Sequence, residues 1–443
     1  MSRESRLVTA LAVATLLTGL PVRGTAQETD SPHAEIDRRA SEVSADVIAW
    51  RRDIHQNPEL GNREFRTAGI VAGHLRSLGF DEVRTDVAHT GVVGVLRGGR
   101  PGPVVGLRAD MDALPVTELV DVPFASTVTA EYNGQEVGVM HACGHDVHTA
   151  ALMGAASVLA GMREDLAGTV VFLFQPAEEG APSGEEGGAE LMVAEGAVES
   201  PRPEAYFGLH TSPFPTGFLG WRSGGIMASA DEFTITVTGK QTHGAAPEMG
   251  VDPIVVASQI VLALQTIPSR QVAATNPVVV TVGKIEGGVR FNIIPETVTL
   301  DGTIRTHDPA VQDDVHARIH RTAEGIAESA GATAEVEIRR LYPVTYNDPA
   351  LTGVAIASLK RVVGEAGLVQ IPPLMVAEDF SFFAQQAPGF YFMLGVNAPG
   401  VGYGEAASNH SPYFYVNEDA LQIGVRALAT LAVDYLERKT EER

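Results

Sequence analysis

Cysteine is nearly absent from this chain of 443 residues, which contains a single one, Cys143. One cysteine cannot form an internal disulfide, so buried apolar surface has to hold the fold together. A free cysteine is usually a small buried apolar residue, and the alternative is a thiolate held by a partner. The composition alone leaves both alternatives open.

Basic residues are scarce. Lysine and arginine number 32 against 55 acidic residues, giving a formal net charge of −23. No basic stripe offsets this charge, so nucleic acid is not expected as a partner. An acidic protein can still bind small anions, but only through local positive groups such as metal ions or a few arginines.

The apolar run at 7–20 is shorter than the roughly 20 residues that a membrane-spanning helix needs. It follows the basic start MSRESR and precedes small residues that end at Ala26. This pattern is typical of a signal peptide, predicted here at 1–26, with the mature chain beginning near Gln27. We therefore expect a periplasmic or secreted protein that leaves the membrane after cleavage; the alternative is an uncleaved membrane anchor.

Apolar residues recur at helical spacing in six segments, at 67–80, 148–162, 252–267, 308–331, 350–367 and 418–439. The strand-like runs between them are of two kinds. Those before about residue 220 are almost continuously apolar, as in strands covered on both faces, whereas 232–239 and 297–305 alternate apolar with polar residues. An α/β domain with a mixed, mostly parallel sheet is therefore predicted at 33–228 and 342–443. A separate α+β domain of ferredoxin-like element order is predicted at 229–341.

Polar clusters follow the predicted buried strands. Because open α/β sheets bind ligands at the carboxyl ends of their strands, we expect these clusters to converge. They supply Cys, His, Glu and Asp, which are ligand types for Zn²⁺, Mn²⁺, Co²⁺ or Ni²⁺. They lie at 108–112, 141–146, 175–180, 208–213 and 408–412.

Each cluster taken alone also has a structural explanation. A lone histidine is usually a hydrogen-bonded core residue, Glu178-Glu179 fits a solvated loop, and Asp110 and Asp112 fit a turn. Two other metal motifs are missing, since the chain has no HExxH sequence and one cysteine cannot supply CxxC. The joint occurrence of the clusters favours a metal site.

Seven ordered segments then give a specific resemblance. HACGHDVHTAALMGAA, FLFQPAEEG, GLHTSPFPTG, THGAAPEMGVDP, RFNIIPE, AEDFSFF and NHSPYFYVNEDAL resemble the metallo-amidohydrolases related to aminoacylases and carboxypeptidase G. Within them the chain is most similar to the hippurate hydrolases and indole-acetyl-amino-acid hydrolases, a likeness that WRRDIHQNPELGNREFRT near the start shares.

The resemblance implies two divalent metal ions, of the Zn, Mn, Co or Ni type, and a general base. The implied ligands are Cys143, His145, Glu179, His210 and His410. Glu178 would be the base, and Asp112 would orient a ligand. His243 would stabilise the oxyanion, often from the partner subunit of a dimer. Asn292 and Arg305 would bind the substrate carboxylate, while the role of Glu378-Asp379 is not implied.

The function so implied is hydrolysis of the amide bond of an N-acyl or N-aroyl amino acid, with the inserted domain serving as lid and homodimer contact. Three alternatives stay open. One is a dipeptidase or carboxypeptidase on the same scaffold. Another is Cys143 as nucleophile with His145 as its base, which leaves the other clusters without a role. The third is a non-catalytic exported protein that binds metal or amino-acid conjugates.

Overall fold

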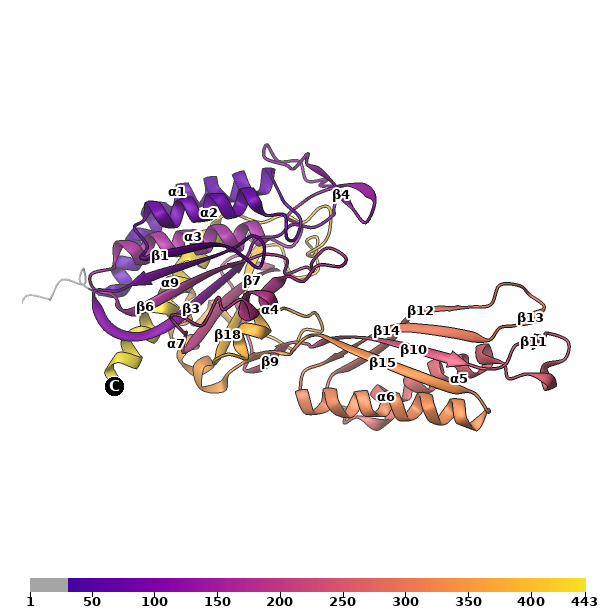
Figure 1. Cartoon of the computed structure of the whole chain (residues 1–443). Helices are drawn as coiled ribbons and strands as arrows, with labels where there is room; N and C mark the ends of the chain where they lie inside the picture. The colour runs from indigo at the N-terminus through magenta and orange to yellow at the C-terminus, as the bar shows by residue number, and fades with distance from the viewer. Residues whose placement is uncertain (1–30) are drawn as a thin grey trace, which may run out of the picture.

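The computed structural model describes residues 31–443, so the predicted signal peptide at 1–26 lies outside the described residues. The described chain forms two units (Figure 1). A broad α/β unit contains both ends of the described chain, and an elongated unit built from the middle of the sequence extends from one side of it. Within 31–443, no helix combines the length and apolar character that crossing a membrane would need.

An eight-stranded sheet forms the centre of the α/β unit, with the order β1-β2-β6-β3-β7-β18-β8-β17. The four central strands, β6, β3, β7 and β18, are mutually parallel. β1 and β2 are antiparallel to their neighbours at one edge, and β8 is antiparallel to β18. In the order of the sheet the strands span Glu82–Val87, Gly91–Arg97, Ala167–Gln175, Arg100–Asp110, Ala205–Pro215, Gly389–Asn397, Leu219–Trp221 and Leu368–Gln370.

Helices cover both faces of this sheet because its strands are apolar on both faces. In β6, alternate residues contribute to two separate apolar clusters, one on each side. The helices of the larger cluster are α1 (Pro32–Gln56), α2 (Phe65–Ser77), α3 (His145–Gly161), α7 (Pro349–Val363) and α9 (Asp419–Glu441). The other face carries α4 (Gly188–Ala194) and α8 (Phe380–Ala384).

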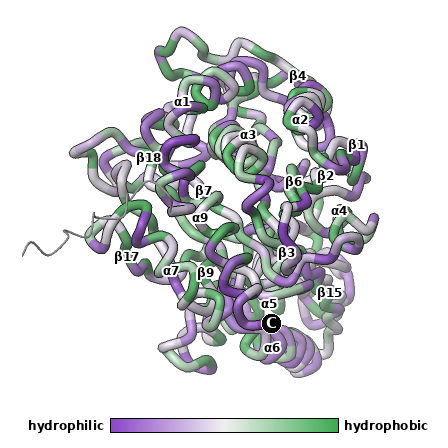
Figure 2. The backbone as a smooth tube through the Cα atoms, turned by 90° about the vertical axis from the view of Figure 1, so that its left-hand side faces the viewer, coloured by the Kyte–Doolittle hydropathy of each residue, from purple (hydrophilic) through white to green (hydrophobic). Residues whose placement is uncertain are grey.

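The buried helix α3 begins directly at the HACGHD motif. Its residues are small or apolar on almost every side, which suits a helix enclosed between α1 and α9. Figure 2 shows the contrast with α6 (Pro309–Ser329), whose tube is largely purple on the outside of the molecule. The start of α3 is thereby fixed in the interior.

The second unit is a four-stranded antiparallel sheet in the order β12-β14-β10-β15, with two helices packed on one face. β10 (Ala230–Thr238) alternates buried with more exposed residues, as its sequence predicts. The remaining elements are β11 (Thr242–His243), α5 (Pro253–Leu264), β12 (Val278–Gly287), β13 (Ile293–Ile294), β14 (Thr297–Thr306) and β15 (Thr333–Tyr342). The predicted fold class, an α/β unit with an inserted ferredoxin-like α+β unit, is confirmed.

Two short strand pairs complete the fold. β9 (Gly224–Met227) pairs with β16 (Thr345–Asn347) where the chain leaves and re-enters the α/β unit. β4 (Thr129–Tyr132) and β5 (Gln135–Gly138) form a hairpin ahead of the HACGHD motif. All six predicted helices are present with ends shifted by a few residues. Three further helices, α1, α4 and α8, lie outside the predicted ranges.

Candidate metal centre

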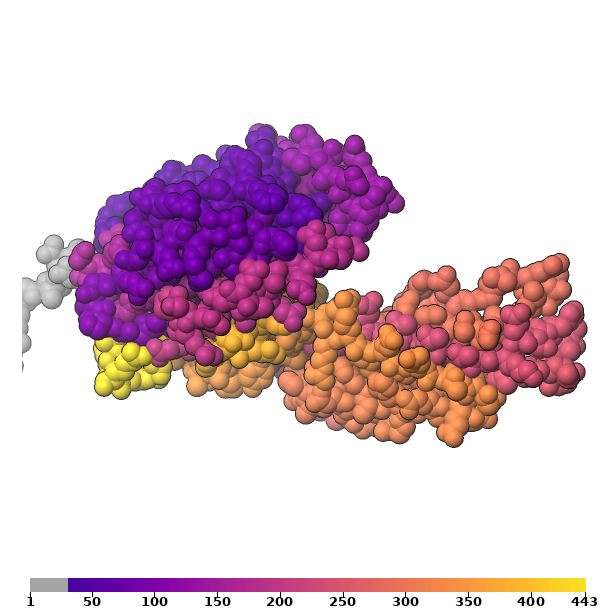
Figure 3. Space-filling view, in the orientation of Figure 1, coloured from indigo at the N-terminus to yellow at the C-terminus, as the bar shows by residue number. Residues whose placement is uncertain are grey.

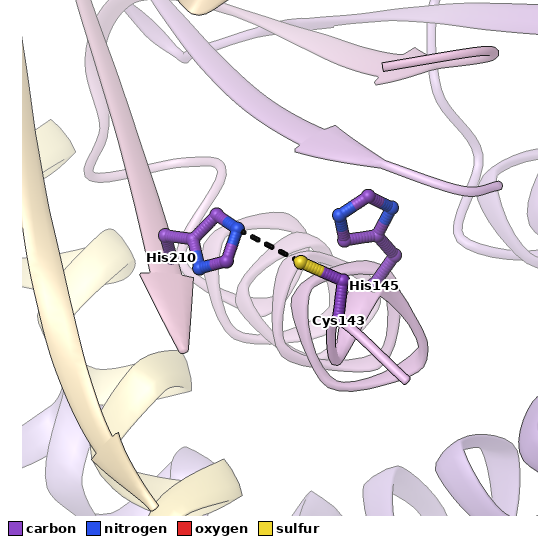
Figure 4. Close-up of side chains that lie close together, drawn as sticks. All are labelled: Cys143, His145 and His210. Atoms are coloured by element: carbon purple, nitrogen blue, oxygen red, sulfur yellow. Dashed lines mark hydrogen bonds between the residues drawn. The ribbon is translucent and has the colours of Figure 1, made fainter. Parts of the chain in front are cut away.

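The start of α3 and the strand β7 bring three predicted ligands together. Cys143 and His145 flank Gly144, and His210 lies in β7. Cys143 Sγ is 3.4 Å from His210 Nε2, and the two side chains point toward one another in Figure 4. Ligand atoms of all three residues lie within 4.8 Å of one another, which is the spacing that one metal ion would require.

A second group of ligand atoms contains Cys143, Glu179 and His410, again within 4.8 Å of one another. His410 Nε2 lies 2.9 Å from Glu179 Oε1. The His410 backbone has a φ of 69° and is fixed by its N–H, which donates to the carbonyl of Ala142 at 2.8 Å. Because Cys143 belongs to both groups, its sulfur is placed where it could bridge two ions.

The hydrogen bonds of His145 leave one ring nitrogen free for a metal. Its Nδ1 lies 3.1 Å from Asp112 Oδ1, which is suited to accept the Nδ1–H. Among the described residues, its buried Nε2 has no hydrogen-bond partner. Asp112 Oδ2 also accepts the N–H of Glu179 at 2.9 Å. One carboxylate therefore contacts a candidate ligand of each group, and this position is compatible with the role predicted for Asp112.

The charge around the centre also fits cations. Burial, together with Glu179 and Glu178, raises the pKa of the Cys143 thiol well above its usual range. Burial lowers the pKa of His145, but Asp110 and Asp112 outweigh it and raise this pKa to about 10. A centre so rich in carboxylates is stabilised by positive charge, and divalent ions would supply it while favouring the thiolate.

A buried arginine lies behind the centre, within the predicted cluster at 108–112 but without a predicted role of its own. Arg108 in β3 donates to Asp110 Oδ2 at 2.7 Å and to Asp379 Oδ1 at 2.8 Å, and it lies 2.8 Å from Glu378 Oε1. The Glu378-Asp379 pair of the AEDF motif is thus part of a structural ion network. An arginine inside an otherwise apolar strand was the available signal, since a buried arginine requires partners.

His148 was also missed as a site residue. Its Nε2 accepts the N–H of Thr211 at 2.8 Å, and its Nδ1 faces Asp110 Oδ1. The hydroxyl of Thr211 donates to the carbonyl of Cys143 at 2.7 Å. These contacts tie Cys143 and the start of α3, where His145 lies, to β7, which carries His210.

A cleft of about 1370 Å³ opens over the centre, between the two units (Figure 3). Its walls include Cys143, Glu178, Glu179, His210 and His410. Burial and the neighbouring Glu378 raise the pKa of Glu178 well above its usual range. The same cleft has an apolar wall formed by Phe214, Met227, Leu374, Phe382 and Met393.

The three residues predicted on the inserted unit are divided between two places. Arg305 is half-buried and lines the cleft. His243 and Asn292 lie on β11 and directly before β13, two paired strands at the far end of the inserted unit (Figure 1). The N–H of Gly244 donates to the carbonyl of Asn292 at 2.9 Å. Within one chain, His243 and Asn292 are therefore close to each other but not to the cleft.

Known proteins resemble this chain in sequence and in fold. The sequence profile of Peptidase family M20/M25/M40 matches residues 106–434. The chain belongs to this family. Similar proteins with names that state different activities cover most of the chain.

An IAA-amino acid hydrolase of Arabidopsis thaliana is 40% identical over 90% of this chain and 88% of the relative. Thermostable carboxypeptidase 2 of Saccharolobus solfataricus is 40% identical over 89% of this chain and 96% of the relative. An N-acetyl-L-cysteine deacetylase of Bacillus subtilis is 36% identical over 86% of each.

Among solved structures, a Bacillus subtilis protein described as a dinuclear metal binding peptidase of family M20 has a TM-score of 0.74 and 33% identity. It covers 90% of this chain and 99% of its own. A protein of methicillin-resistant Staphylococcus aureus reaches a TM-score of 0.82 with 34% identity, covering 91% of this chain and 100% of its own.

Proposed function

We propose that this protein is a dinuclear metal-dependent amidohydrolase that cleaves N-acyl or N-aroyl amino acids into a carboxylic acid and a free amino acid. The observation that carries the proposal is the sharing of Cys143 between two groups of ligand atoms, beside Glu178 in an open cleft. The relatives named for indole-acetyl conjugates and N-acetylcysteine support this substrate class.

Two divalent ions held by Cys143, His145, Glu179, His210 and His410 would polarise the amide carbonyl and acidify a water molecule. Glu178 takes one proton from that water as its oxygen attacks the carbonyl carbon. Glu178 then gives the proton to the amide nitrogen as the C–N bond breaks. Burial and Glu378 raise the pKa of Glu178, and two bound cations would lower it again toward the range in which the carboxylate can accept a proton.

Arg305 is suited to bind the carboxylate of the amino-acid half. It lines the cleft as a cation in a protein of strongly negative charge. A guanidinium presents several N–H donors to a carboxylate, so this contact would orient the substrate as well as attract it. The apolar wall formed by Phe214, Met227, Leu374, Phe382 and Met393 would then receive the acyl group.

His243 and Asn292 would act in a homodimer, where the inserted unit of one subunit reaches the cleft of the other. Their position far from their own cleft supports this assignment. The exposed apolar side chains of Leu262, Val289 and Phe291 on the same unit also favour a protein contact there. The predicted signal peptide at 1–26 supports a periplasmic or secreted location for the enzyme.

The proposal is tested by measuring release of free amino groups from N-benzoyl, N-acetyl and N-indoleacetyl amino acids and from dipeptides. Each substrate is offered to the metal-depleted protein and to the same protein after Mn²⁺ or Zn²⁺ is restored. We expect metal-dependent release from the N-acylated compounds. Preferential cleavage of dipeptides would instead favour the dipeptidase or carboxypeptidase alternative, and metal binding without any cleavage would favour a binding protein.

A further inference from the structure

The loop at 176–180, called here the glutamate loop, carries the proposed base Glu178 and the candidate ligand Glu179. Side chains from other parts of the chain contact the backbone of its three central residues. Tyr342, at the end of β15, donates its hydroxyl to the carbonyl of Glu178 at 2.8 Å. Asp112 accepts the N–H of Glu179 at 2.9 Å. The remaining contact, to Ala177, involves a residue without an assigned role.

That residue is Glu64, which lies in the NPELGNREF segment directly before α2. Its side chain is fully buried, and Oε1 accepts the N–H of Ala177 at 2.8 Å. Its other oxygen, Oε2, accepts a hydrogen bond from the hydroxyl of Thr90. A buried acidic side chain needs such partners, and here one partner is the backbone of the glutamate loop itself.

Ala177 needs to be held because its backbone is in the left-handed region. Its φ is 50°, a conformation that is unfavourable for residues with a Cβ and that glycine adopts freely. Without a contact at its N–H, Ala177 would favour a negative φ. Rotation at this residue would move Glu178 and Glu179, which follow it directly.

The same N-terminal segment approaches the glutamate loop at a second point. A Cβ on Gly61 would lie 2.9 Å from the carbonyl oxygen of Gly180 and 3.1 Å from Ala177 Cβ. This approach is close enough that only glycine fits without a shift of the loop. The segment 61–64 and the glutamate loop are therefore packed against each other in one defined arrangement.

From these contacts we infer that Glu64 is a positioning residue for catalysis, which holds Ala177 in its left-handed conformation and thereby aims Glu178 and Glu179 at the metal centre. This inference rests on the proposed function, because it takes Glu178 as the base. It gives the NPELGNREF segment a role in the reaction although none of its residues lines the cleft.

The test compares kcat, KM and the rate of metal loss to a chelator in the full-length variants. Glu64→Leu should lower kcat by at least about tenfold and speed metal loss, because the glutamate loop moves. KM should stay within about threefold, because the other residues that line the cleft keep their positions. Glu64→Gln keeps an acceptor for Ala177 and should stay within about threefold of the wild type. Thr85→Val, which removes a hydroxyl that donates to the neighbouring Asp86 away from the glutamate loop, is the control and should retain kcat.

The decisive variant is Ala177→Gly in the Glu64→Leu background. Glycine adopts a positive φ without cost, so it should restore part of the lost kcat, by about threefold or more. Because glycine at this φ also stabilises the fold, kcat is compared per mole of folded protein, so that a general gain in stability does not count as recovery. Unchanged kcat in Glu64→Leu, or no recovery in the double variant, would overturn the inference.

If Glu64→Leu does not fold, Gly61→Ala provides a second test of the loop position. The Cβ added at residue 61 would overlap with Ala177 and Gly180 and displace the glutamate loop. Gly61→Ala should lower kcat at constant KM, and a wild-type kcat would contradict the inference. Glu178→Gln is measured alongside all of these variants. If it retains turnover, the proposed base is wrong; if it is inactive while Glu64→Leu is normal, only the positioning role fails.

Discussion

At the scale of single residues, Asp112 links the two groups of candidate ligands. Replacing it by Ala removes the acceptor for His145 and for the N–H of Glu179. We expect metal affinity to fall by about 10- to 100-fold, as is typical when a hydrogen-bond partner of a metal ligand is lost. Competition with a chromogenic chelator measures this affinity.

Asp121→Asn is the control for Asp112→Ala, because Asp121 is exposed and makes no hydrogen bond through its side chain within residues 31–443. It should bind metal like the wild type. Equal affinities for Asp112→Ala and the wild type would exclude Asp112 from the centre.

Glu64 also gives a prediction for pH. Burial and the neighbouring Asp112 raise its pKa from 4.5 to about 8 in the folded protein. The folded state therefore binds more protons than the unfolded state between these values, so this residue's contribution to stability falls as the pH rises from about 4.5 to 8. Chemical denaturation measures the free energy of unfolding from pH 5 to 8. This free energy should decline less steeply with pH for Glu64→Gln, because the amide cannot titrate. Identical slopes for the two proteins would contradict the assigned pKa.

The candidate ligands could be proposed from the sequence because they stand in short motifs, as Cys143 and His145 do. The roles of Arg108, His148 and Glu64 could not, since their partners are distant in the sequence. Glu64 contacts Ala177, and Arg108 contacts Asp379. Only the packing of the sheet reveals which pairs meet.

At the scale of elements, the start of α3 depends on Gly144. Its φ is 92°, and a Cβ there would lie 2.4 Å from Thr211 Oγ1. Gly144→Ala should lower the free energy of unfolding by about 2 kcal/mol or more and weaken metal binding, because the left-handed backbone and the overpacking both cost energy. Thermal and denaturant unfolding would measure the first effect.

Gly73→Ala is the matched control for Gly144→Ala. Gly73 lies within α2, and a Cβ there meets no atom within 4 Å. Alanine in a helix at an open position should be neutral or stabilising by roughly 0.5–1 kcal/mol. Similar effects of the two substitutions would contradict the special role of Gly144.

The elements themselves were largely predictable. Strongly periodic segments such as α6 and α9 appear near their expected positions, and the contrast between continuous and alternating strands separated the two sheets. The helix α1 was missed because it contains many charged residues, and only some of its residues are buried. The side of α1 that is buried becomes evident only from its contacts with α3 and α9, because the amino-acid composition of the helix does not reveal it.

At the scale of the whole molecule, the position of His243 predicts that two subunits share each active site. Variants His243→Ala and Glu178→Gln should each be inactive alone. After mixing and subunit exchange, about a quarter of all sites should combine an intact Glu178 with the partner's intact His243. Activity should return toward that fraction of the wild type.

If His243 acted within its own chain, every site in the mixed dimers would lack one essential residue and no activity would return. Phe291→Asp provides a check on the contact itself. Phe291 is 94% exposed in the single chain, and a charge there should shift the protein toward monomers in sedimentation velocity. An unchanged sedimentation coefficient would remove this surface from the proposed interface.

The central claim is that Glu178 performs proton transfer at a two-metal centre that it does not itself build. The most direct test measures bound metal per chain and amine release from an N-acyl amino acid, in parallel, for the wild type and Glu178→Gln. We predict two ions per chain in both proteins and turnover only in the wild type. Turnover by Glu178→Gln, or wild-type protein that hydrolyses the substrate after its metal has been removed, would contradict the account.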